Sequence, residues 1–243
     1  MTEVPSESGA PTRPGTLYGV SVGPGDPELM TLKAVRVIES CPVVAAPHAR
    51  RGADVALEIA RSAVDLSGKR ILELPFSMSR DEREREAGRR ASVELLTDEL
   101  AAGHDVALLN LGDAGIYSTF GYVRDAVARA GYRVETVPGV PSFCAVAARL
   151  GRSLTEGSAD PLHIIPAVGE GFADDLRLPG SLVVMKAGRS LGEVKRALAE
   201  AGRLEEASLV SDCGLPDERV ADALDEAPDD AAGYFTTLVV ARR

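Results

Sequence analysis

The pattern that most constrains the fold is an alternation of short apolar runs with longer segments of helical periodicity. The expected strands of the first part of the chain cover residues 16–22, 43–46, 70–74, 106–111 and 132–137. The expected helices between them cover residues 28–40, 54–64, 81–102 and 120–130. Strands that alternate with helices form a parallel sheet with helices on both faces. The sequence therefore predicts an α/β fold, whose ligands bind beyond the carboxyl ends of the strands.

A second, smaller α/β unit is expected after Gly139 and Pro141, which interrupt the pattern. Helices are expected over residues 142–150 and 191–201, and strands over 162–165, 181–185, 208–210 and 234–240. Residues 1–15 are rich in Pro, Ser, Gly and Thr, which favours a disordered tail. The predicted division is therefore a tail over 1–15, an N-terminal domain over 16–140 and a C-terminal domain over 141–243.

Charge and composition exclude several classes of function. The net charge of −10 argues against nucleic acid as the main partner, because phosphate binding needs a basic surface. No run of 18 apolar residues is present, so no membrane span is expected. The three cysteines have no metal-ligand spacing, and Cys41 and Cys144 are expected to be buried. A reduced, cytoplasmic protein that binds no metal of its own fits these features.

The first motif of chemical interest is the glycine-rich turn after the first expected strand. Gly23 and Gly25 permit a tight turn, while Asp26 and Pro27 suit the start of a helix. A dinucleotide fingerprint would have a third glycine where Glu28 stands, and the Gly-Lys-Ser/Thr ending of a P-loop is absent. Alone, this motif predicts only a well-capped turn.

Further turns of the same kind follow other expected strands. Gly112 would let a ligand approach the backbone, and Asp113 would accept hydrogen bonds or cap a helix. Similar turns that contain glycine or proline are expected at residues 137–143, 185–188 and 214–218. The charged segment 81–90 is read as a solvated helix face with i,i+4 ion pairs such as Glu86 with Arg90. Because parallel strands end at one side of their sheet, the turns predict a single cleft.

These ordered motifs resemble the tetrapyrrole methylase family. The segment from Gly19 to Ala34, Gly112-Asp113, residues 137–140 and Met185 occur in the family's order and spacing. Segments 116–120, 185–189, 216–219 and 234–243 resemble the members that methylate C-20 of precorrin-2 or cobalt-factor II. The resemblance implies two αβα domains with S-adenosylmethionine in the cleft between them, and a homodimer.

The resemblance also implies which residues contact the cofactor. They are Pro24, Leu111, Gly112, Asp113, Ile116, Pro141, Ser142, Met185 and Gly214. Two of this chain's residues depart from the family pattern. Many relatives have Pro where Ala114 stands and Thr where Pro141 stands, and Pro141 cannot donate a backbone hydrogen bond.

S-adenosylmethionine carries its own leaving group, so methyl transfer to a ring carbon needs alignment and exclusion of water rather than an enzyme nucleophile. A base must still remove the proton from the methylated carbon. Some relatives carry an acidic residue after the second strand, where this chain has His48. His48 is therefore the candidate base. The alternatives are that His48 is a surface loop histidine or that it binds a substrate carboxylate. Arg50 and Arg51 are candidates to bind substrate carboxylates, and His104 and His163 are read as structural.

Three alternatives remain open from the sequence. The chain can be a methylase of the same family acting at another ring position or on another substrate. It can be a nucleotide-binding module or dehydrogenase, against which the missing third glycine and the lack of an acidic residue after the second strand both count. It can also be a non-catalytic protein that binds S-adenosylmethionine. The sequence does not decide whether cobalt is already in the ring.

Overall fold

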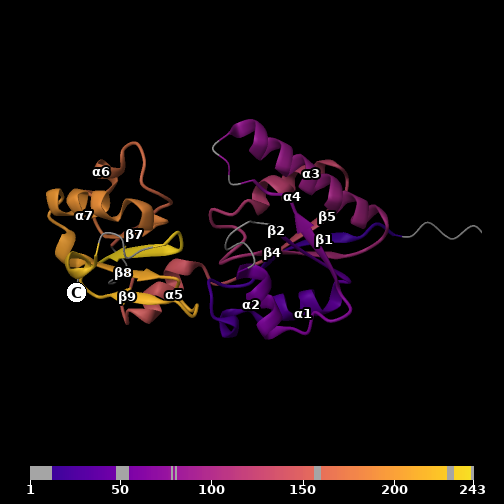
Figure 1. Cartoon of the computed structure of the whole chain (residues 1–243), viewed down its shortest axis with the longest axis horizontal. Coiled ribbons are helices and arrows are strands. Elements are labelled where there is room, and N and C mark those ends of the chain that lie inside the picture. The colour runs from indigo at the N-terminus through magenta and orange to yellow at the C-terminus, as the bar shows by residue number, and fades with distance from the viewer. Residues whose placement is uncertain are drawn as a thin grey trace, which may run out of the picture.

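The protein folds into two lobes, each built on a sheet with helices on both faces (Figure 1). The computed structural model describes residues 13–47, 55–77, 79, 81–155, 160–228 and 233–241. Residues 1–12 of the expected tail lie outside this range, whereas residues 13–15 are described. The first lobe contains β1 to β5 with α1 to α4, and the second contains α5 to β10 (Figure 1).

The first sheet is entirely parallel, as the alternating sequence pattern predicts. Its five strands are β1 (Thr16–Ser21), β2 (Val43–Pro47), β3 (Arg70–Leu74), β4 (Val106–Asn110) and β5 (Arg133–Val137). They lie side by side in the order β3-β2-β4-β1-β5. The carboxyl ends of all five strands therefore point the same way, and the ends of β1, β4 and β5 are neighbours. We call the carboxyl ends of β1, β4 and β5, with the loops that follow, the first sheet end.

Two pairs of helices cover the faces of this sheet. Helices α1 (Leu32–Ser40) and α2 (Val55–Ala63) bury Ile38 and Ala60 against one face. Helices α3 (Glu82–Ala101) and α4 (Phe120–Arg129) bury Leu96 and Phe120 against the other. The chain thus leaves β1 toward one face and the adjacent β4 toward the opposite face. This divergence is the topological switch point at which α/β sheets bind ligands.

The second sheet is mixed rather than parallel. Its strands are β6 (Leu162–Ile165), β7 (Ser181–Met185), β8 (Ala207–Ser211), β9 (Arg219–Ala221) and β10 (Thr236–Val240). The order is β6-β7-β10-β8-β9, and β10 is antiparallel to both of its neighbours. An apolar run specifies a strand but not its direction, so the sequence did not predict this arrangement.

Helices also cover both faces of the second sheet. Helix α5 (Ser142–Arg149) packs Val146 against Val210 and Val239 on one face. The other face is covered by α6 (Phe172–Asp175) and α7 (Leu191–Glu200). Short 3-10 turns complete the fold: η1 (Pro27–Leu29), η2 (Ala187–Ser190), η3 (Leu204–Glu206) and η4 (Leu224–Glu226). This arrangement confirms the predicted α/β fold class, with two sheets that each carry helices on both faces.

Three details differ from the sequence expectations. The helix expected over 28–40 is divided into two, because η1 ends at Leu29 and α1 begins at Leu32. Thr31 is the N-cap residue of α1, and its hydroxyl accepts the Ala34 amide at 3.1 Å. Cys41 is buried as expected, but Cys144 is exposed, because it lies on the outer face of α5. Glu86 pairs with Arg89 one residue earlier than the i,i+4 expectation. Among the described helices, none is long and apolar enough to cross a membrane.

Candidate active site at two facing sheet ends

The loops after β1 and β4 are joined by their backbones. The Gly23 amide donates to the carbonyl of Gly112 at 3.2 Å, and the Gly112 amide donates to the carbonyl of Gly23 at 2.7 Å. Both glycines have left-handed φ angles, 77° at Gly23 and 72° at Gly112, which residues with a Cβ rarely adopt. The two glycine-rich turns singled out in the sequence therefore meet at the switch point of the sheet.

The Asp113 carboxylate joins the loop after β4 to the loop after β5. Its Oδ1 accepts the amide of Gly115 at 2.8 Å, and its Oδ2 accepts the amide of Gly139 at 2.8 Å. Asp113 thus caps a turn and not a helix. Each carboxylate oxygen keeps a second lone pair for a ligand donor.

Ser21, the last residue of β1, joins the loop after β4 to the end of β5. Its hydroxyl donates to the carbonyl of Val137 at 2.7 Å and accepts the amide of Ala114 at 2.9 Å. The side chain is fully buried. Sequence reasoning missed this residue, although a serine inside an otherwise apolar strand and just before a glycine turn is a detectable signal.

The space in front of Gly112 faces the start of α5. A Cβ added at Gly112 would meet only the backbone nitrogen of Ser142, at 3.9 Å. Pro141 is the N-cap residue of α5, with an extended backbone and no side-chain cap. The missing Cβ therefore leaves a recess bounded by the loop after β4 and the first turn of α5.

The second sheet presents its own strand ends to this region. Strands β6 and β7 are parallel, and β7 and β8 are both antiparallel to β10, so β6, β7 and β8 end on the same side. Lys186 directly after β7 and Asp212 directly after β8 both have left-handed φ angles, 55° and 52°. Strained residues of this kind cluster at binding and catalytic sites. We call the ends of β6, β7 and β8, with their following loops, the second sheet end.

Two contacts place the two sheet ends against each other. A Cβ added at Gly25 would lie 2.1 Å from the carbonyl oxygen of Cys213, so the two loops touch without intervening side chains. The hydroxyl of Tyr117 donates to the carbonyl of Ile164 in β6 at 3.1 Å. Tyr117 has a left-handed φ of 47° and is half exposed. The loops after β1 and β4 thus each reach the second lobe.

Charged groups stabilise the loop after β8 at this contact. The Glu218 carboxylate accepts the Gly214 amide at 2.9 Å and pairs with the Arg149 guanidinium at 2.5 Å. These interactions lower the pKa of Glu218, with the Gly214 amide as the largest cause. Burial, and then the charge of Glu218, raise the pKa of the Cys213 thiol to about 11. Cys213 is therefore protonated at neutral pH and is not a nucleophile.

Asp212, in the same loop as Cys213, is a carboxyl group whose charged form is disfavoured. Burial is the largest cause that raises its pKa, followed by repulsion from Asp217, and Arg219 opposes the shift. The neighbouring Lys186 ammonium lies 5.7 Å from the centre of the Tyr234 ring, within the range of a cation–π contact.

The nine predicted cofactor residues lie at strand ends, in the loops that follow them, or at the start of α5. Of these, Pro24, Leu111, Gly112, Asp113, Ile116, Pro141 and Ser142 belong to the first sheet end or to the start of α5, and Met185 and Gly214 to the second. Ile116 is 36% exposed, which leaves its side chain available to a ligand. The predicted base His48 and the predicted substrate residues Arg50 and Arg51 lie outside the described residues.

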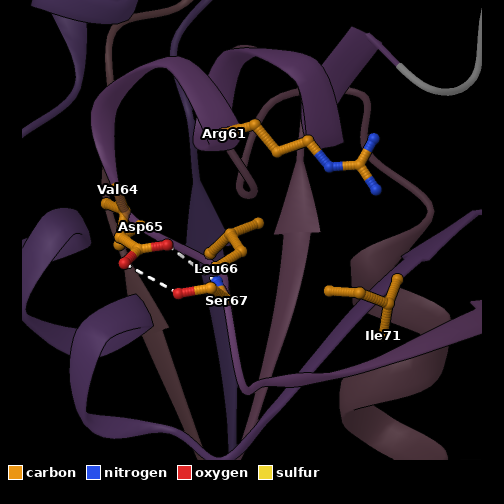
Figure 2. A pocket seen from close by; sticks show the side chains of 6 residues that line it. All are labelled: Arg61, Val64, Asp65, Leu66, Ser67 and Ile71. Atoms are coloured by element: carbon orange, nitrogen blue, oxygen red, sulfur yellow. Dashed lines mark hydrogen bonds between the residues drawn. The ribbon is translucent and has the colours of Figure 1, made fainter.

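A surface hollow elsewhere on the first lobe is unrelated to these loops. It is lined by Arg61, Val64, Asp65, Leu66, Ser67 and Ile71 (Figure 2). The Asp65 carboxylate is occupied by the amide and hydroxyl of Ser67, both at 2.8 Å. The hollow lies where the chain enters β3, at the opposite end of the sheet from the site. Within the described part of the chain, no group of three or more metal-ligating side chains is present.

Solved structures of similar architecture include tetrapyrrole methyltransferases. A cobalt precorrin-4 methyltransferase superposes with a TM-score of 0.73 at 21% identity, covering 92% of this chain and 94% of that one, which shows the fold alone. Uroporphyrin-III C-methyltransferase from Thermus thermophilus, in complex with S-adenosylhomocysteine, superposes with a TM-score of 0.68. It is 26% identical and covers 93% of this chain and 97% of its own.

Curated relatives match over nearly the whole chain. A cobalt-precorrin-2 C(20)-methyltransferase of Salmonella typhimurium is 36% identical over 93% of this chain and 96% of its own length. A precorrin-2 C(20)-methyltransferase of a Sinorhizobium species is 33% identical over 93% and 95%. The model of the tetrapyrrole (corrin/porphyrin) methylases matches residues 16–228. With its glycine turns at the switch point and its two αβα lobes, this chain belongs to the tetrapyrrole methylase family.

Proposed function

We propose that this protein transfers a methyl group from S-adenosylmethionine to C-20 of precorrin-2 or of its cobalt complex, a step in cobalamin biosynthesis. The observation that carries the proposal is the match to C(20)-methyltransferases of two bacteria across more than nine-tenths of each chain. The two glycine turns joined at the switch point support it, because α/β sheets bind ligands at this position.

The residues at the two sheet ends fit S-adenosylmethionine. The recess in front of Gly112 has no Cβ to fill it, and the Asp113 carboxylate keeps free lone pairs toward ligand hydroxyl or ammonium groups. Met185 and Gly214 lie at the second sheet end and would contact the part of the cofactor that faces that lobe. Pro141 offers no amide, and its carbonyl accepts the Cys144 amide of α5 at 3.1 Å, so its contribution comes from its ring.

When bound, S-adenosylmethionine supplies an electrophilic methyl group on a sulfonium. The chain's residues supply the rest. The loops joined by Ser21 and Asp113 fix the donor in one orientation, which lowers the entropic cost of reaching the transition state. The contact between Gly25 and the loop after β8 closes one side of the site against water.

The proton on the methylated carbon needs an acceptor. His48 directly follows Pro47, the last residue of β2, and β2 ends on the same side of the sheet as β1 and β4. The chain thus enters the 48–51 segment from the side that carries the site. We propose His48 as the base, and Arg50 and Arg51 as partners for the acetate and propionate groups of the substrate.

The first experiment is calorimetric titration of the purified protein with S-adenosylhomocysteine. Micromolar binding supports the cofactor site, and no binding by folded protein contradicts it. Turnover with metal-free and cobalt-containing precorrin-2 then identifies the substrate, and carbon-13 spectra of the product made with a labelled methyl group identify the ring position. Methylation at a carbon other than C-20 would favour another member of the family, and binding without turnover would favour a non-catalytic protein.

Assembly, location and domain division belong to the same proposal. We propose a cytoplasmic homodimer whose chain divides at residue 140 into an N-terminal and a C-terminal domain. Sedimentation equilibrium measures the oligomeric state directly. Limited proteolysis tests the boundary, because the proposed junction between β5 and α5 should be cut only after the lobes separate.

A further inference from the structure

The hydroxyl of Ser21 is a fully buried side-chain group that is bonded to the backbone of both the loop after β4 and the end of β5. It donates to the Val137 carbonyl at 2.7 Å and accepts the Ala114 amide at 2.9 Å. The side chain is 0% exposed, so no water competes for either bond. A buried hydroxyl with both functions engaged fixes the relative position of the segments that it joins.

Ala114 occupies a position where the chain needs such a restraint. The Ile116 amide donates to the Asp113 carbonyl at 3.2 Å, which makes residues 113–116 a β-turn with Ala114 as its second residue. Proline is favoured at this position because its ring sets φ in advance. Alanine leaves φ unrestrained, but its free amide can be held by an acceptor, and the Ser21 hydroxyl is that acceptor.

The surrounding packing leaves this arrangement little freedom. A Cβ added at Gly139 would lie 2.4 Å from the Cβ of Ser21 and 2.9 Å from the carbonyl oxygen of Gly112. The loop after β5 therefore lies directly on Ser21, and only glycine permits it to do so. Three strand ends thus converge on one serine side chain.

We propose that Ser21 is a positioning residue for methyl transfer: its hydroxyl holds the 113–116 turn against the end of β5 and so sets the shape of the cofactor recess. The proposal rests on the proposed function, because both loops that Ser21 joins carry residues assigned to S-adenosylmethionine. Ser21 acts through these loops and does not itself touch the reacting atoms.

The test combines two substitutions in the full chain. Ser21→Ala removes the restraint and should weaken S-adenosylhomocysteine binding by about fivefold or more, the effect of one buried hydrogen bond. Ala114→Pro alone removes the amide and presses the proline ring on the Ser21 hydroxyl, so it should weaken binding at least as much. The double variant regains the restraint from the ring without the clash, and it should bind within about twofold of the original protein.

Kinetics separate positioning from a general loss of stability. Ser21→Ala should raise the KM for S-adenosylmethionine while the KM for the tetrapyrrole stays within about twofold, because only the cofactor loops are released. Ser208→Ala is the matched control: this serine is equally buried and donates to the Asp222 carbonyl at 2.5 Å in the second lobe. It should lower thermal stability without changing the KM for S-adenosylmethionine.

Three results would overturn the inference. The first is that Ser21→Ala binds S-adenosylhomocysteine as tightly as Ser208→Ala does. The second is that the double variant binds S-adenosylhomocysteine no better than Ser21→Ala does. The third result applies if Ser21→Ala does not fold. Ser21→Cys then replaces it, because a thiol has a similar shape but is a weak hydrogen-bonding group. Unchanged S-adenosylhomocysteine binding by Ser21→Cys would also overturn the inference. If the original protein binds S-adenosylhomocysteine and one of these results is obtained, only the inference about Ser21 is overturned. If the original protein does not bind S-adenosylhomocysteine, the proposed function is overturned as well.

Discussion

Gly25 and Gly214 lie so close together across the two lobes that neither position has room for a side chain. A Cβ on Gly25 would lie 2.1 Å from the Cys213 carbonyl oxygen, and one on Gly214 would lie 2.5 Å from the Asp26 backbone nitrogen. The approach of the lobes is therefore set by backbone against backbone, without an intervening side chain that could adjust. This contact closes the site on the side of the loop after β1.

We expect Gly25→Ala to separate the lobes and weaken S-adenosylhomocysteine binding by tenfold or more. Backbone atoms must move to admit the methyl group, and overpacking of this kind costs about 1–3 kcal/mol. Calorimetry with S-adenosylhomocysteine and thermal unfolding measure the two effects. Gly202→Ala is the control, because Gly202 has a left-handed φ of 70° but nothing within 4 Å, so it tests backbone strain without a clash. Equal binding by Gly25→Ala and the control would contradict the prediction.

Asp113→Ala should lower both stability and cofactor affinity. The substitution leaves the amides of Gly115 and Gly139 without their acceptor, at a cost of about 1–3 kcal/mol. Asp113→Asn retains one carbonyl oxygen and should lose less of each. Chemical denaturation and calorimetry provide the measurements. If Asp113→Asn binds S-adenosylhomocysteine as weakly as Asp113→Ala while it is more stable than Asp113→Ala, that result would show that the charge of Asp113 itself contacts the ligand.

The Tyr117 hydroxyl is a contact between the lobes that can be removed without changing the core. Tyr117→Phe loses the bond to the Ile164 carbonyl, worth about 0.5–1.5 kcal/mol. We expect little change in the melting temperature but a lower kcat/KM, because the lobes would be less firmly held together during methyl transfer. Steady-state kinetics test this. An unchanged kcat/KM would mean that the Gly25 contact suffices alone.

Glu218 should make the protein less stable in acid. Its pKa is lowered in the folded state by the Gly214 amide and by Arg149, so its contribution to stability is complete above the ordinary glutamate value of 4.5. The contribution is lost as the pH falls through the lowered pKa. Denaturant unfolding at a series of pH values, compared between the original protein and Glu218→Gln, isolates this slope.

Asp212 contributes with the opposite sign, because its pKa is raised. Its charged form destabilises the folded state above the ordinary aspartate pKa, and this cost disappears as the pH falls. Since Asp212 is present in both proteins, the difference between them reports Glu218. Parallel curves for the two proteins below pH 4.5 would contradict the role assigned to Glu218.

The strands and helices of the first lobe could be predicted from the sequence because each follows a clear hydrophobic period. Expected and observed bounds agree for β3 and differ by a residue or two for α2, α3, α4 and β5. The short strand β9 has only three residues, of which two are exposed and one is partly buried, so it carries little apolar signal. Direction is likewise invisible in an apolar run, which is why the antiparallel placement of β10 was not foreseen.

The site was only partly predictable, for a related reason. Glycine turns at strand ends are visible in the sequence, and the structure brings those after β1 and β4 into direct contact. Ser21 is bonded to the turn after β4 and to the end of β5, and Glu218 ties the loop after β8 to Arg149, in each case across a long stretch of chain. The bond from Ser21 to Val137 spans 116 residues, and that from Arg149 to Glu218 spans 69. Such pairings depend on tertiary structure, so a local pattern can mark a residue such as Ser21 as unusual but cannot identify its partner.

The central position of β10 has a consequence for synthesis on the ribosome. All strands and helices of the first lobe precede residue 140, so this lobe can fold while the second is still being translated. The second sheet cannot close until residues 236–240 emerge, since β10 lies between β7 and β8. Until then, β7 and β8 each present an unpaired apolar edge, which is prone to aggregate. Premature termination before residue 236 should therefore yield an insoluble product.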